Sequence, residues 1–385
     1  MLGLLGTGVP SARADAIRAQ QWALDALHTE AAWRTSKGAG VTVAVLDTGV
    51  DDGHPDLAGQ VLSGKDFVGF GAGPGERSWA RHGTAMAGII AGRGHGPGRG
   101  DGVVGIAPEA RILPVRVILE DGDPSRTRAR GARGHALAEG IRWAADHGAD
   151  VINLSLGDDS GTAHPEPGED AAVRYALDKG AVVVASAGNS GEQGDPVSYP
   201  AAYPGVIAVT AVGRDGGRAP FSTRHWYAAV AAPGVDVVIA DPDRRYYEGW
   251  GTSAAAAFVS GAAALLRSAH PGLSPAQVRA LLVGTARDTP PGGRDDALGA
   301  GLVDPAAALA AAEHLTPRPQ RPAVVPYAHR YFGDDPAPPR PDDGPATPGT
   351  LALTAAATGV VLLAAAFALW RTAPTGRRWR GARQR

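Results

Sequence analysis

The chain has 385 residues, which is enough for one large globular domain with appended segments. Its formal net charge is -2, so the charge gives no indication of a nucleic-acid partner. It contains no cysteine, which excludes disulfides, thiolate metal sites and a cysteine nucleophile.

The N-terminus resembles the end of a secretory signal peptide. A short apolar run leads to Ala12-Arg13-Ala14, and this A-x-A pattern predicts cleavage before Asp15. The basic segment that usually begins a signal peptide is missing, so a plain terminal segment is the alternative. We expect residues 1–14 to be a signal-peptide remnant.

The body of the chain alternates short apolar runs with helical patterns. Runs rich in β-branched residues predict strands at residues 41–46, 112–117, 151–154, 182–186, 206–212 and 235–239. Helical patterns lie between several of them, at residues 82–91, 134–147 and 169–179. This alternation indicates βαβ units, so we expect an α/β fold with a mostly parallel central sheet. In such sheets, ligands and chemistry gather at the carboxyl ends of the strands.

Several helices carry explicit start signals. Thr29 can cap a short helix, and Gly251-Thr252-Ser253 leads into an alanine-rich helix with the serine as its expected cap. Ser274-Pro275-Ala276-Gln277 is a capping box with proline in the first helical position, and Asp304-Pro305 begins the last helix. We therefore expect one globular domain over residues 15–314, with an N-terminal arm.

Beyond this domain the composition changes twice. Residues 315–350 are rich in Pro, Asp and Arg, which predicts an extended linker. Residues 351–370 are uncharged and mostly apolar, and a helix of this length spans about 30 Å, the thickness of a bilayer core. A buried core helix is the alternative. Residues 371–385 are arginine-rich, so the positive-inside rule predicts a single-pass protein with a cytoplasmic tail and an extracytoplasmic domain.

A set of polar residues stands where predicted strands end or helices begin. In chain order they are Asp47, His82, Asn189 and Ser253. Each also fits a structural role, as a turn residue, a helix-start residue or a helix cap. Together they supply a carboxylate, an imidazole base, an amide donor for an oxyanion and a hydroxyl nucleophile, in the order of the subtilisin-type triad. This combination indicates hydrolysis by nucleophilic catalysis.

The motifs around these residues resemble those of the subtilisin-like (subtilase) serine proteases. They are Val45-Leu46-Asp47-Thr48-Gly49-Val50 with His54-Pro55-Asp56-Leu57, His82-Gly83-Thr84, Asn153-Leu154-Ser155-Leu156-Gly157, Ser186-Ala187-Gly188-Asn189 and Gly251-Thr252-Ser253. The resemblance implies a three-layer α/β subtilase fold and serine endopeptidase activity. It implies Asp47, His82 and Ser253 as the catalytic triad. Asn189 and the Ser253 N–H would form the oxyanion hole.

The same resemblance implies how the substrate is bound. Two motifs would contact it through Ser155, Leu156, Gly157, Ser186, Ala187 and Gly188. The first three would pair with an extended peptide as an added strand. No cofactor and no metal is expected. Asp51, Asp52 and Asp56 could bind calcium, as in some subtilases, but solvated loop acids are the simpler interpretation.

A narrower resemblance is to the mycosins, the membrane-anchored subtilases of actinobacterial type VII secretion systems. Gln21-Trp22-Ala23-Leu24-Asp25-Ala26-Leu27 carries it, with the secretory start, the proline-rich linker and the apolar run at residues 351–370. It implies a protease that processes type VII substrates at the membrane, with secretion-complex components as partners. The alternative is a structural component of that complex, with proteolysis secondary. Ala257, where the family usually has proline, and the missing cysteines are departures, and residues 120–134 lie where the family has an extra loop.

Overall fold

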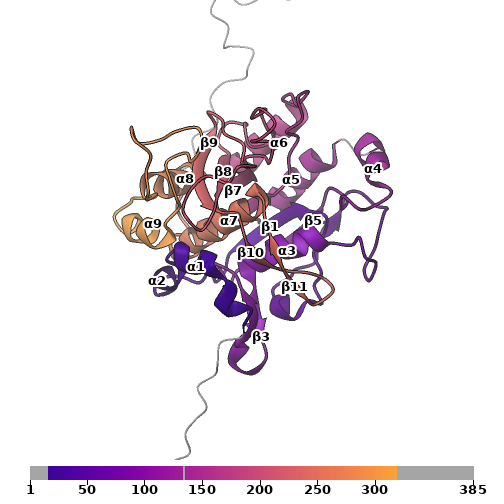
Figure 1. Cartoon of the computed structure of the whole chain (residues 1–385), viewed down its shortest axis with the longest axis horizontal. Helices are drawn as coiled ribbons and strands as arrows, with labels where there is room; N and C mark the ends of the chain where they lie inside the picture. The colour runs from indigo at the N-terminus through magenta and orange to yellow at the C-terminus, as the bar shows by residue number, and fades with distance from the viewer. Residues whose placement is uncertain (1–15, 133–134, 319–385) are drawn as a thin grey trace, which may run out of the picture. The chain divides into compact units, whose positions relative to one another are not determined.

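The computed structural model describes residues 16–132 and 135–318 (Figure 1). The expected signal-peptide remnant, the apolar run at residues 351–370, the basic tail and most of the linker lie outside these residues. Within the two described ranges, no helix is long and apolar enough to cross a membrane.

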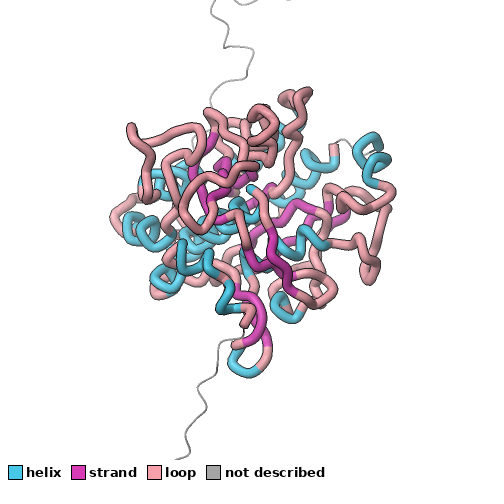
Figure 2. Tube along the Cα trace, viewed as in Figure 1, coloured by secondary structure: helices cyan, strands magenta, loops and turns pink. Residues whose placement is uncertain are grey.

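A parallel sheet runs through the middle of the described chain (Figure 2). Its seven strands have the order β2-β5-β1-β6-β7-β8-β9, and every neighbouring pair among these described strands is parallel. The bounds are β1 Thr42–Asp47, β2 Lys65–Asp66, β5 Arg111–Arg116, β6 Val151–Leu154, β7 Val182–Ser186, β8 Ile207–Val212 and β9 Ala228–Pro233. The predicted parallel sheet is thus confirmed.

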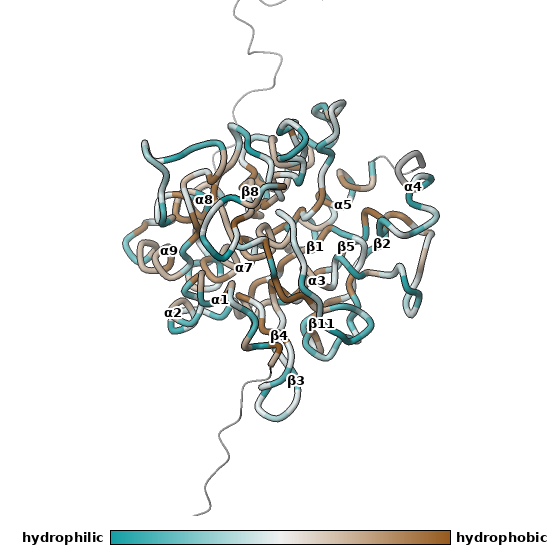
Figure 3. Tube along the Cα trace, viewed as in Figure 1, coloured by the Kyte–Doolittle hydropathy of each residue, from teal (hydrophilic) through white to brown (hydrophobic). Residues whose placement is uncertain are grey.

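Helices cover both faces of this sheet. One face carries α3 Arg81–Ala91, α7 Thr252–Ala269, α8 Pro275–Gly284 and α9 Pro305–Ala312, with α1 Trp22–Ala26 and α2 Thr29–Trp33 beside them. The other face carries α5 Ala136–Asp146 and α6 Pro167–Asp178, while α4 Arg126–Ala132 follows the loop after β5. The result is the expected three-layer α/β arrangement, with apolar residues in the interior and polar ones on the outer loops (Figure 3).

Strand β1 shows why the layers form and where its last residue points. Side chains alternate between the two faces of a strand. Val43 and Val45 belong to the hydrophobic core with α3 and α7, whereas Ala44 and Leu46 belong to the core with α5 and α6. By the same alternation, Asp47 faces the layer that contains α3 and α7.

One strand prediction needs correction, and several observed strands were not predicted. The run at residues 235–239 forms β10 Val237–Ala240, which pairs antiparallel with β11 Tyr246–Gly249 and lies outside the central sheet. The connection between them is too short for a parallel crossover, so the two strands form a hairpin. Strand β9 is not predicted, because its residues are mostly alanine and it ends in proline. The pair β3 Arg93–His95 and β4 Asp101–Val104 is also missed, since glycines dominate that segment.

The helix start signals were mostly right. Ser274 and Gln277 form the complete capping box, and the Asp304 side chain accepts a hydrogen bond from Ala307 N at 2.9 Å. The expected cap at Thr29 is wrong, because Thr29 is already the first helical residue and His28 precedes it in the left-handed region, with φ 51°. The Thr29 hydroxyl is buried and has no hydrogen-bond partner among the described residues.

Candidate active site

Asp47 and His82 meet at the carboxyl edge of the sheet. Asp47 is the last residue of β1, and His82 is the second residue of α3. His82 Nδ1 lies 2.8 Å from Asp47 Oδ1 and 2.9 Å from Oδ2. The carboxylate is fully buried, whereas the histidine side chain is 36% exposed. Thr48 N also donates to Asp47 Oδ1 at 2.7 Å, so the carboxylate is held from two sides.

A glycine allows α3 to come this close to β1. A Cβ atom added at Gly83 would lie 1.9 Å from the Gly49 carbonyl oxygen and 3.2 Å from Asp47 Cβ. No side chain fits at such distances, so the residue after His82 has to be glycine for the pair to form.

The surroundings of His82 favour its charged form. Burial disfavours the imidazolium, but the charge and hydrogen bond of Asp47, with the charges of Glu120 and Asp121, raise the pKa of His82 to about 9. A general base must be neutral to accept a proton. The fraction of His82 that can act as a base therefore increases as the pH rises toward 9.

Ser253 lies in the first turn of α7 and not at its cap. The helix begins at Thr252, and Gly251 is the capping residue, with φ 140° and no side-chain cap bond. The expectation of a serine cap is therefore wrong in position, because glycine takes the turn that only it adopts without strain. Ser253 Oγ donates to the Ser155 carbonyl oxygen at 3.1 Å, and Ser155 Oγ donates to the Ser253 carbonyl oxygen at 2.9 Å. These two bonds join α7 to the end of β6.

Asn189 is fixed through its amide oxygen, and within residues 16–132 and 135–318 its amide nitrogen donates no hydrogen bond. Its Oδ1 accepts hydrogen bonds from Thr252 N and Thr252 Oγ1, both at 2.9 Å. A Cβ atom added at Gly251 would lie 3.7 Å from Asn189 Nδ2 and 3.7 Å from Ser253 N. Asn189 Nδ2 and Ser253 N are the two donors that the family resemblance implies for the oxyanion hole. They therefore border the same space.

The six expected substrate-contact residues come from neighbouring strand ends. Ser155, Leu156 and Gly157 follow β6, while Ser186 ends β7 and Ala187 and Gly188 follow it. Ser186 Oγ donates to the Leu156 carbonyl oxygen at 3.5 Å, and Gly188 N donates to Thr252 Oγ1 at 3.3 Å. Since β1, β6 and β7 are consecutive in the sheet, their carboxyl ends bring both motifs to Asp47 and Ser253.

This geometry agrees with the comparison to known protein families. The model of the subtilase family (Peptidase_S8) matches residues 38–301. The chain belongs to the subtilase family. It is accordingly a serine endopeptidase, a hydrolase of peptide bonds.

Individual subtilases give a more detailed comparison. Thermitase of Thermoactinomyces vulgaris is 39% identical over 267 residues, which cover 69% of this chain and 88% of thermitase. Mycosin-1 of Mycobacterium tuberculosis is 37% identical over 396 aligned residues, which cover 91% of this chain and 85% of mycosin-1. The crystal structure of MycP1 from Mycobacterium smegmatis has a TM-score of 0.67 at 33% identity, covering 85% of this chain and 92% of that one. The chain is a mycosin-like subtilase.

One of the similar structures has a described place in a larger system. It is a serine protease MycP1, described as an essential component of the type VII (ESX-1) secretion system. Its TM-score is 0.64 at 36% identity, over 78% of this chain and 90% of that one.

A cavity of about 270 Å³ in this subtilase is lined by both His82 and Ser253. Other side chains also line it, and among them the sequence motifs do not point to Met86, Glu120, Ile239 or Trp250. Trp250 is 66% exposed and directly precedes the Gly251 motif. Its position next to that motif is the feature of the sequence from which its place in the cavity could have been predicted. For Glu120, the signal would have been its position shortly after β5, which pairs with β1.

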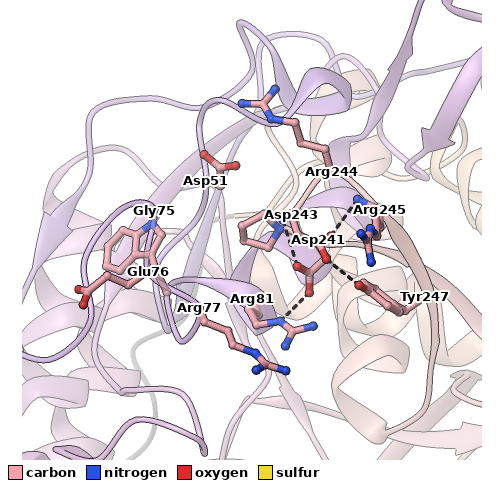
Figure 4. A pocket seen from close by; sticks show the side chains of 12 residues that line it. Asp51, Gly75, Glu76, Arg77, Arg81, Asp241, Asp243, Arg244, Arg245 and Tyr247 are labelled. Carbon is pink, nitrogen blue, oxygen red and sulfur yellow. Dashed lines mark hydrogen bonds and ion pairs between the residues drawn. The ribbon is translucent and has the colours of Figure 1, made fainter.

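A second cavity of about 440 Å³ adjoins the first, because Arg81 and Asp241 line both (Figure 4). Arg81 Nε donates to Asp241 Oδ2 at 2.7 Å, and this pair is drawn in Figure 4. The guanidinium beside His82 is thus paired with a carboxylate of its own. It does little to offset the negative charges that face the imidazole of this subtilase.

Asp56 of this subtilase is not the solvated loop acid that the sequence suggests. Its carboxylate is buried, pairs with His95 Nδ1 at 2.6 Å, and accepts from Val103 N at 2.9 Å and from Tyr246 OH at 2.8 Å. The glycine-rich pair of strands β3 and β4 folds over it and supplies two of these partners. Both carboxylate oxygens of Asp56 are therefore hydrogen-bonded to groups of the protein.

The alanine that replaces the usual proline leaves the start of α7 in place. Ala257 is fully buried, and the helix begins at Thr252, one residue before Ser253. The departure from the family pattern therefore does not move Ser253 out of the first turn.

Proposed function

We propose that this subtilase cleaves peptide bonds with Asp47, His82 and Ser253 as its triad and with an acyl-enzyme intermediate. The observation that carries the proposal is the Asp47–His82 pair, 2.8 Å apart, beside a cavity that His82 shares with Ser253. His82 takes the Ser253 proton, and Ser253 attacks the peptide carbonyl. Asp47 holds the ring and stabilises the imidazolium. Water then releases the acyl group.

In this proposal the serine changes its hydrogen-bond partner during the reaction. Ser253 Oγ donates to the Ser155 carbonyl in the present structure. Rotation about one side-chain bond redirects it toward His82 Nε2, since hydrogen bonds of catalytic groups often tighten only when substrate binds. Asn189 Nδ2 and Ser253 N then donate to the oxyanion, because the Asn189 oxygen is already occupied by Thr252.

The substrate-contact residues have the roles that the family resemblance implies. Ser155, Leu156 and Gly157 pair with an extended substrate as an added strand. Ser186, Ala187 and Gly188 form the facing wall. The hydrogen bond from Ser186 Oγ to the Leu156 carbonyl ties the two segments together, which supports their acting as one site.

A fluorophosphonate tests the proposed nucleophile. We expect the folded protein to react with one equivalent of the reagent, because an activated serine is its target. Peptide mapping by mass spectrometry should then place the adduct on Ser253. Protein denatured before labelling is the control and should not react. Labelling of a different serine, or none in folded protein, would contradict the assignment.

We further propose that the enzyme is anchored in the cell membrane, with residues 15–314 outside the cytoplasm. Residues 1–14 would be the signal-peptide remnant, residues 315–350 the linker, residues 351–370 the membrane helix and residues 371–385 the cytoplasmic tail. The support is the long uncharged apolar run and the arginines that follow it.

Its place would be a type VII secretion system, where it would process substrates and contact other components. Support comes from the 37% identity to mycosin-1 over 91% of this chain, and from MycP1, described as essential to such a system. The same description favours a second candidate function, in which the protein stabilises the secretion complex and proteolysis is secondary.

A comparison of two strains separates these functions. One lacks the protein, and the other carries Ser253→Ala at normal abundance. If the scaffold function is essential, export should collapse in the deletion strain only. If the protease function is essential, export should fail equally in both strains. Immunoblots of membrane fractions provide the control for abundance and for anchoring.

A further inference from the structure

The N-terminus of α3 has no cap of its own. The residue before the helix is Ala80, which lies in the left-handed region with φ 52° and cannot accept a hydrogen bond through its side chain. The first N–H groups of a helix need partners from outside the helix. Here Gly83 N donates to Thr48 Oγ1 at 3.2 Å, and His82 N donates to Glu120 Oε1 at 2.8 Å. Residues from two other segments thus replace the missing cap.

We propose that Glu120 is a positioning residue for catalysis: it holds the first turn of α3 so that the His82 ring stays against Asp47, and it stabilises the imidazolium that forms when Ser253 is deprotonated. This inference rests on the proposed triad. Glu120 bonds to the main chain of the residue that carries the base, and lines the same cavity as His82 and Ser253. The bond to His82 N is the contact through which it acts on the base.

Glu120 is held firmly enough to do this. Its neighbour Leu119 is 1% exposed and packs with Val68 and Ala129 in a small apolar cluster. Asp123 N donates to the Glu120 carbonyl oxygen at 3.0 Å, and the Asp123 carboxylate accepts from Ala72 N at 2.8 Å. The loop after β5 is therefore tied to the loop after β2, and the Glu120 carboxylate is carried on this joined structure.

The charges around His82 show why a carboxylate is needed at this position. Asp47 faces the ring from β1, and Glu120 and Asp121 face it from the loop after β5. Arg81, on the same helix, is paired with Asp241. The N-terminus of α3 carries a partial positive charge that disfavours an adjacent cation. Glu120 offsets that charge, and it contributes to the raised pKa of His82.

The test is the pH dependence of kcat/KM for the purified full chain, measured with a chromogenic peptide. Glu120→Gln keeps an acceptor for His82 N and removes the charge. We expect the rising limb of its profile to move to lower pH by roughly half a unit, with the alkaline plateau within about twofold of the parent enzyme. Glu120→Ala removes the acceptor as well. We expect the same shift together with a plateau lower by roughly tenfold, since misplacement of a catalytic group is costly.

Asp121→Asn is the matched control, because it removes an adjacent negative charge that does not bond to His82. Asp121 is 93% exposed and pairs with Arg126 at 2.8 Å. Asp121→Asn should move the rising limb of the kcat/KM profile less than Glu120→Gln does. In about 1 M salt the shift of Asp121→Asn should vanish, whereas the shift of Glu120→Gln should persist. The inference is overturned if Glu120→Gln leaves the profile unchanged, or if Asp121→Asn matches it in high salt. Should Glu120→Ala fail to fold, Glu120→Gln alone decides. Failure of the triad itself would show differently, as activity that survives Ser253→Ala.

Discussion

Replacing Ser253 with alanine should lower kcat for peptide hydrolysis by on the order of 10⁶, the scale already established for the serine of subtilisin itself. The substitution removes the hydroxyl that we propose as the nucleophile. Binding and the oxyanion donors Asn189 Nδ2 and Ser253 N would remain, so activity should fall to a low residual rate above that of water. A continuous assay with a fluorogenic peptide at the alkaline plateau measures the loss.

The control for this variant is another serine on the same helix. Ser260 Oγ donates to Asn153 Oδ1 at 3.0 Å and is fully buried, away from the cavity that contains Ser253. Ser260→Ala should reduce stability, because it leaves a buried acceptor without this donor, but kcat should stay within a few-fold. Undiminished kcat in Ser253→Ala would refute the proposed nucleophile.

Replacing Asp47 with asparagine should lower kcat by on the order of 10⁴, with little loss of fold. Asparagine keeps the shape of the side chain but removes the charge that stabilises the imidazolium. Its NH₂ group can also force the His82 ring into the wrong tautomer. The pKa of His82 should fall as well, since Asp47 makes the largest favourable contribution to it. The measurement is kcat against pH, with thermal unfolding recorded alongside.

A second buried carboxylate–imidazole pair provides the control for Asp47. Asp56 is fully buried beside His95, whose side chain is 38% exposed, and the two lie 2.6 Å apart. In burial and distance this pair matches Asp47 and His82, but it does not line the cavity with Ser253. Asp56→Asn should lower the melting temperature and leave kcat nearly unchanged. An equal loss of kcat in both variants would mean that Asp47 acts only through stability.

The sequence predicts the centre of the fold better than its edges. Strands β6 and β7 have the predicted bounds, because each is a short β-branched run between clear turns. Strand β9 has little signal of its own, since its alanines are buried by neighbours that the sequence does not reveal. The hairpin of β10 and β11 shows that a strand pattern does not contain its pairing partner.

The candidate site could likewise be predicted only in part. The positions of Asp47, Asn189 and Ser253 could be predicted because each stands at the end or start of a strong pattern. The orientation of the Asn189 amide could not, because it depends on contacts with Thr252, distant in the chain. The position of Glu120 shortly after β5 is a signal in the sequence, but its contact with His82 N is not. The missing cap before α3 signals that a partner is needed, but only the packing of two loops identifies it.

Strand β1 contributes alternate side chains to both hydrophobic cores, so Asp47 ends a strand that is buried on both faces of the sheet. Core strands of this kind open to solvent only when most of the domain unfolds. The base strength of His82 therefore has a fixed part, from Asp47, and an adjustable part, from Glu120. Substitutions in the loop after β5 would alter the contribution of Glu120 and leave that of Asp47 in place. A lineage of such enzymes could shift its working pH by altering a loop while its catalytic core stays constant.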